Sequence, residues 1–79
     1  MPFYFFVWDE ENIEHLEEHG VSTEEFEAIV SDPEQEDSSR SSGRPMAFGF
    51  TADGRLIACV FERIDDATVY PVTAFEIED

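Results

Sequence analysis

The side chains that offer acid–base or electrostatic chemistry are two histidines and four arginines: His15, His19, Arg40, Arg44, Arg55 and Arg63. A histidine exchanges a proton near neutral pH, and an arginine guanidinium binds phosphate oxygens through a planar fork of donors. Cleavage of RNA without a metal needs a base, an acid and a cation that stabilises the phosphorane. If the chain is an enzyme of this kind, a metal-independent endoribonuclease, then His19, Arg44 and Arg55 are its candidate catalytic residues, with His15 and Arg40 as further candidates.

Each candidate also has a structural interpretation. His19 ends a predicted helix, where a histidine interacts with the last carbonyl groups and with the helix dipole. Arg44 and Arg55 flank one predicted hairpin, so a shared site requires them to converge on its mouth. The alternative is that both arginines lie at solvated strand ends, paired with neighbouring carboxylates.

The same residue types do not predict a metal or cofactor site. His15 and His19 are spaced i, i+4 on one helix face but have no clear third ligand. Cys59 lies within a predicted strand and has no basic neighbour to lower its pKa, so we expect a core residue and not a nucleophile. A glycine-rich phosphate loop is absent from the sequence. We expect no metal and no cofactor.

The charge balance argues against strong binding to nucleic acid. The chain has no lysine, and its four arginines stand against 20 acidic residues, which gives a net charge of −16. Proteins that bind nucleic acid normally carry a basic patch to neutralise phosphates. RNA binding is therefore expected to be weak. The acidity has three further explanations: solubility in a salty cytoplasm, a basic protein partner, or mimicry of nucleic acid.

Length and composition indicate one small domain over residues 1–79. A hydrophobic fraction of 42% with 14% aromatics argues against disorder. A single cysteine excludes an internal disulfide. The apolar start is too short for a signal peptide and has no basic residue before it, and a membrane-spanning segment is not visible. We expect a cytoplasmic protein without membrane contact.

Two helices are predicted from their start and stop signals. The first spans residues 10–19, with Asp9 as N-cap and Gly20 after its end. The second spans residues 23–31, with a capping box that starts at Ser22 and a stop at Asp32-Pro33. The second helix should bury one face, because Phe26, Ile29 and Val30 follow at helical spacing.

Strands are predicted over residues 3–8, 45–51, 55–63 and 68–77, and a mobile polar connector over about 32–43. Pro71 cannot donate a ladder hydrogen bond, so the last strand should lie at an edge or carry a bulge there. The expected fold is α+β: an N-terminal strand, two short helices, then a three-stranded antiparallel meander, with the helices on one face of the sheet.

The predicted strands are apolar on both sides. Ile57, Cys59 and Phe61 alternate with Leu56, Ala58 and Val60. Two short helices cover one face only, so the other face needs the connector, the C-terminus or a second chain. We expect a homo-oligomer or a tight complex with another protein.

Specific segments match a known family. They are Trp8-Asp9, His19-Gly20-Val21-Ser22, Glu24-Glu25-Phe26, Gly49, Asp53-Gly54-Arg55-Leu56 and Val69-Tyr70-Pro71-Val72-Thr73-Ala74. In these residues, and in the order of its elements, the chain resembles the BrnT-like toxins of bacterial toxin–antitoxin pairs. The resemblance implies a fold related to RelE-like toxins, ribonuclease activity, and a small antitoxin protein as partner.

Two positions depart from the family pattern. Phe75 stands where family members carry an arginine, and Glu18 stands where they carry a basic residue. Both changes remove positive charge where a phosphate would be handled. We therefore expect a family member with weakened or lost ribonuclease activity and a partner-binding role. The alternatives are an active toxin neutralised by its antitoxin, and an acidic interaction module that forms homodimers or binds a basic protein.

Overall fold

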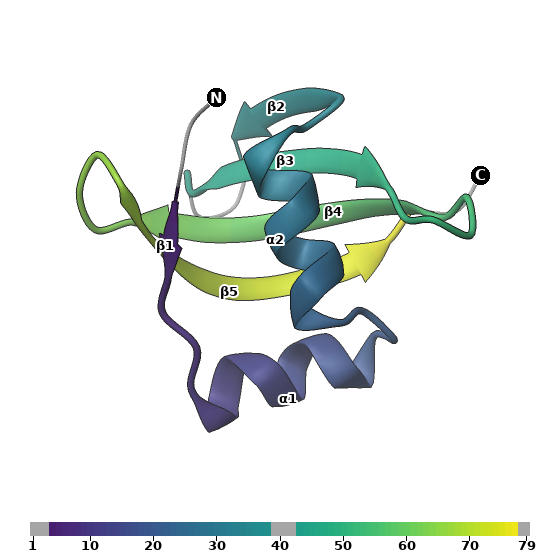
Figure 1. The fold of residues 1–79 in the computed structure, drawn as a ribbon, viewed down its shortest axis with the longest axis horizontal. Coiled ribbons are helices and arrows are strands. Elements are labelled where there is room, and N and C mark those ends of the chain that lie inside the picture. The colour runs from purple at the N-terminus through teal and green to yellow at the C-terminus, as the bar shows by residue number, and fades with distance from the viewer. Residues whose placement is uncertain (1–3, 39–42, 78–79) are drawn as a thin grey trace.

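The computed structural model describes residues 4–38 and 43–77, which form two helices and a five-stranded sheet (Figure 1). The elements are β1 (Phe5–Phe6), α1 (Glu10–Glu18), α2 (Thr23–Ser31), β2 (Gln35–Ser38), β3 (Pro45–Phe50), β4 (Leu56–Arg63) and β5 (Thr68–Glu76). The sheet order is β1-β5-β4-β3-β2, with β1 parallel to β5 and all other pairs antiparallel. The fold is thus α+β with a mixed sheet, and β3, β4 and β5 form an antiparallel meander within it.

Both helices begin at reciprocal caps. The Asp9 carboxylate accepts from the Asn12 backbone at 2.8 Å, and the Asn12 side-chain oxygen accepts from the Asp9 backbone at 2.9 Å. Ser22 and Glu25 make the equivalent pair at 3.1 and 3.0 Å. Each cap satisfies backbone donors that the first turn of a helix leaves open. The predicted helix bounds are confirmed within one residue.

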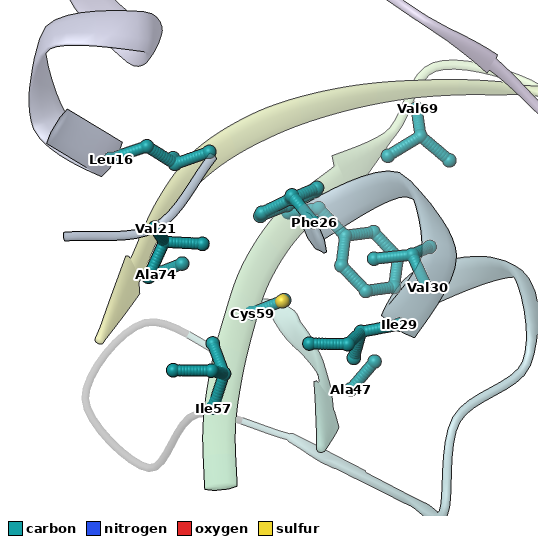
Figure 2. Close-up of a cluster of buried hydrophobic side chains, with 11 residues drawn as sticks. Leu16, Val21, Phe26, Ile29, Val30, Ala47, Ile57, Cys59, Val69 and Ala74 are labelled. Carbon is teal, nitrogen blue, oxygen red and sulfur yellow. The ribbon is translucent and has the colours of Figure 1, made fainter. Parts of the chain in front are cut away.

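The two helices take different positions on the sheet. Figure 1 shows α2 crossing one face of the sheet, whereas α1 lies alongside β5. Figure 2 shows Phe26, Ile29 and Val30 of α2 facing the strands that carry Ala47 and Cys59. The buried cluster consists of Leu16, Val21, Phe26, Ile29, Val30, Ala47, Ile57, Cys59, Phe61, Val69 and Ala74. The helix-covered face, as we call the side that carries this cluster, holds the main core.

Helix α1 closes the edge of β5 beyond the short strand β1. The Asn12 side chain donates to the Pro71 carbonyl at 3.1 Å, and the His15 ring lies 3.2 Å from the Val72 carbonyl. The register between β4 and β5 shifts here, because Val60 pairs with Thr73 while the next residue pairs with Pro71. The predicted irregularity at Pro71 is confirmed, and the displaced carbonyls bond to side chains of α1.

The expected polar connector contains a strand. β2 pairs with β3 along its whole length, and all four of its side chains are exposed. A strand that buries no side chain has no apolar alternation, so hydrophobic periodicity does not reveal it. Its acidic, exposed edge also discourages pairing with other chains. Gln35–Ser38, within the segment expected to be a polar connector, therefore forms a strand that the sequence did not predict.

Neither helix of the described residues is long and apolar enough to cross a bilayer.

Candidate functional site

Arg55, at the β3–β4 turn, bonds to the loop between the helices, which begins at another candidate residue, His19. His19 is the C-cap of α1, and the next carbonyl, that of Gly20, accepts from Arg55 Nη1 at 3.1 Å. Gly20 has φ of 70°, a conformation that glycine adopts without strain. The loop that follows His19 is thus tied to the start of β4 by an arginine.

Carboxylates bond to the other two nitrogens of the Arg55 guanidinium. Its Nε lies 3.0 and 3.2 Å from the two carboxylate oxygens of Asp53, and its Nη2 lies 3.4 Å from Glu25. Hydrogen bonds from Thr51 and then Arg55 hold the pKa of Asp53 below its usual value, and Asp53 in turn raises the pKa of Arg55. The structural interpretation of Arg55, a strand-end arginine paired with acids, matches this geometry.

Arg44 lies at the other end of the hairpin. Its Nε donates to the Glu62 carboxylate at 2.8 Å, near the end of β4, whereas Arg55 precedes the first residue of that strand. Seven residues of extended chain separate Glu62 from Arg55, roughly 23 Å at the usual rise. The two arginines flank an antiparallel hairpin from opposite ends, so the expected convergence at its mouth is wrong. Arg40 lies outside the described residues.

Arg44 instead shares a small cavity with the other histidine. The cavity, of about 200 Å³, is lined by Glu11, Asn12, His15, Arg44, Glu62, Tyr70, Pro71 and Val72. Because a carbonyl oxygen only accepts, the contact between His15 Nδ1 and the Val72 carbonyl requires the proton on Nδ1. In the neutral ring Nε2 is then an acceptor, the form that a general base requires.

Tyr70 and Asn12 are two polar residues of this cavity that the sequence did not single out as functional. The Tyr70 hydroxyl donates to Asp9 at 2.6 Å, which raises the pKa of Tyr70 and lowers that of Asp9. Asn12 is 2% exposed, and its amide also donates to the Val7 carbonyl at 2.9 Å. Asn12 therefore positions the cavity wall. The feature of the sequence that indicates its role is the capping pair that it forms with Asp9 at the start of α1.

A larger hollow lies between α2 and the end of β3. It has a volume of about 650 Å³ and is lined by Ser22, Glu24, Glu25, Ala28, Ile29, Asp32, Glu34, Gly49, Phe50, Thr51 and Ala52. Gly49 lets Ile29 of α2 pack closely on β3 beside the hollow, because an added Cβ would lie 3.0 Å from the Ile29 side chain. Four carboxylates on its lining make the hollow acidic. This hollow was not predictable from the sequence, because its wall comes from three separate segments.

The described residues contain no group of three or more His, Cys, Asp or Glu placed to hold a metal. Cys59 is fully buried, and burial raises the pKa of its thiol to about 12. A thiol with so high a pKa is a poor nucleophile at neutral pH. This burial agrees with the expectation that Cys59 is a core residue.

The face of the sheet opposite the helix-covered face carries a second set of apolar side chains. Phe48, Ala58 and Phe75 form one row across β3, β4 and β5, and Phe50 pairs with Leu56 beside it. Directly paired residues share a face, and their neighbours in sequence, such as Ile57, point to the core. We call the side that bears Met46, Phe48, Phe50, Leu56, Ala58, Val60 and Phe75 the open face.

Comparisons with protein-family models, with curated proteins and with solved structures give no match to this chain.

Proposed function

We propose that this protein is a BrnT-like toxin-family member with weakened or lost ribonuclease activity, and that it acts by binding a protein partner. The observation that carries the proposal is the placement of the candidate cations. Arg55 is bonded to Asp53 and Glu25, and Arg44 is bonded to Glu62 at the far end of β4. A phosphate would have to compete with an internal carboxylate for each guanidinium.

Phe75 supports the loss of activity. It lies on β5, 36% exposed, at the position where the resemblance calls for an arginine. An aromatic ring offers no hydrogen bond to the charge that develops on a phosphorane. Removal of one such electrostatic contact typically lowers a reaction rate by ~10²–10³.

The test is induced expression in a bacterial host together with an RNA digest by the purified protein. We expect neither growth arrest nor cleavage by the wild-type chain. Phe75→Arg should restore cleavage only if the rest of the site is intact. Strong arrest and cleavage by the wild type, lost in His19→Ala or Arg44→Ala, would overturn the proposal in favour of an active toxin.

A second candidate function, an active metal-independent ribonuclease, is favoured by the 200 Å³ cavity. There His15 offers an acceptor nitrogen, Tyr70 a hydroxyl and Arg44 a cation, which are the three roles that RNA cleavage needs. In that case His15→Ala and Tyr70→Phe would each abolish cleavage, whereas His19→Ala, which lies outside this cavity, would not. The same digest therefore separates the two candidate sites.

A further inference from the structure

We propose that the open face of the sheet binds an amphipathic, basic segment of another protein. This inference rests on the proposed partner-binding function and names both the surface and the chemistry of the partner. It requires the segment to present apolar side chains to the sheet and lysine or arginine side chains at its margins.

The open face exposes large apolar side chains to solvent. Phe50 is 60% exposed and Phe75 is 36% exposed, and they lie on neighbouring rows of the sheet. Ala58 pairs with both Phe48 and Phe75 in that row and is itself fully buried, so the exposed apolar area comes from the larger side chains around it. Contiguous exposed apolar surface of this kind marks interaction sites, because its burial is favourable.

The negative charge of the chain favours a basic partner over a second copy of the chain. The chain carries a net charge of −16, so two copies brought face to face would repel each other. The described arginines are already engaged: Arg44 and Arg55 by carboxylates, and Arg63 over the rings of Tyr4 and Phe61. A basic partner gains from the same field that opposes a second copy.

Acidic groups stand where the margins of such a segment would lie. Asp37 on β2 pairs with Met46, so its carboxylate is beside the apolar rows at the sheet edge. Phe50, at the other end of β3, also lines the 650 Å³ hollow that bears Glu24, Glu25, Asp32 and Glu34. The open face is therefore bordered by Asp37 at the β2 edge, and Phe50 adjoins the further carboxylates around the hollow.

The experiment uses the full chain and three synthetic peptides about 18 residues long, enough for five helical turns. One peptide has a leucine face and a lysine face, the second has glutamate in place of lysine, and the third has the first composition in scrambled order. Binding is followed by calorimetry. The open-face variant is Phe50→Ser with Phe75→Ser. The matched control is Phe5→Ser with Ile64→Ser, two exposed residues at the opposite end of the sheet from Phe50 and Phe75.

We expect the leucine–lysine peptide to bind the wild type and the control variant equally. The open-face variant should bind it at least roughly tenfold more weakly, because two buried aromatic contacts are lost. Equal weakening in both variants, or equal binding of the scrambled peptide, would overturn the proposal by showing attraction through charge alone. Binding of the glutamate peptide as tight as that of the lysine peptide would also overturn it.

Sedimentation of the wild type alone adds a further outcome. A dimer that the open-face substitutions dissolve would assign this face to a second copy and overturn the basic partner. If the double variant does not fold, Phe50→Ser alone serves, since that side chain is mostly exposed. The RNA digest does not depend on these peptides, so failure here and failure of the proposed function are distinguishable.

Discussion

The two faces of the sheet have the same strands and nearly the same apolar content but different surroundings. On β4, Ile57, Cys59 and Phe61 lie under the helix layer and are almost fully buried. On the open face, the neighbouring strands present Phe50 and Phe75 to solvent. Ala58 and Val60, which lie on the open face of β4, are also buried, so the exposed apolar surface of this face comes from the strands on either side of β4.

The largest expected loss of stability comes from removing a buried side chain on the helix-covered face. Phe26→Ala removes a fully buried ring that packs against Phe6 and Trp8, and should cost about 3–5 kcal/mol of the free energy of unfolding. That amount is enough to unfold a domain this small. Urea denaturation followed by Trp8 fluorescence measures it.

Phe50→Ala on the open face is the matched control. It should change the free energy of unfolding by no more than about 0.5 kcal/mol, as surface substitutions usually do. Similar losses of unfolding free energy in Phe26→Ala and Phe50→Ala would contradict the difference in burial between the two faces.

The second prediction concerns the edge that α1 closes. Asn12→Ala leaves the carbonyls of Val7 and Pro71 without their side-chain donor and removes half of the α1 cap. We expect a loss of about 2–4 kcal/mol, because buried acceptors without partners are costly. Glu14→Ala, an exposed position on the same helix, controls for helix propensity. Equal melting temperatures for the two variants would show that the Asn12 bonds contribute little.

The third prediction uses Cys59 as a reporter of the helix-covered face. Burial raises its pKa from 9.0 to about 12, so the folded state favours the protonated thiol. Its contribution to stability is complete below pH 9 and is lost as the pH rises towards 12. The native protein should resist alkylation at pH 8 and react once unfolded. The pH profile of Cys59→Ala should lack this alkaline loss; identical profiles would contradict the assignment.

The smallest expected effect is that of salt. A net charge of −16 produces self-repulsion that added ions screen. The melting temperature should therefore rise between low and moderate sodium chloride concentrations. A flat or falling response in differential scanning calorimetry would mean that the carboxylates are already compensated within the fold.

Much of the local structure follows from the sequence, because its signals lie within a few residues of each other. The caps at Asp9 and Ser22 set the helix starts, and Gly20 permits the turn between them. The bounds of β3, β4 and β5 follow from alternation and from the turn at Asp53-Gly54. The irregularity beside Pro71 follows from its missing N–H group.

The candidate site was less predictable, since it depends on direction and position in three dimensions. His15 and Arg44 are 29 positions apart in sequence, yet they share a cavity because α1 lies along β5. Arg44 and Arg55 are closer in sequence but stand at opposite ends of an antiparallel hairpin. The side-chain types alone do not distinguish these arrangements.

Sequence by itself determined the element types, the acidic charge and the two-sided apolar character of the strands, because propensity, capping and alternation are properties of neighbouring residues. Only the tertiary structure decided that β1 pairs in parallel with β5, that the exposed segment Gln35–Ser38 adds a strand, and that α1 closes an edge while α2 covers a face. These outcomes depend on backbone hydrogen bonds and packing between distant segments, which leave no periodic trace in the residues that make them.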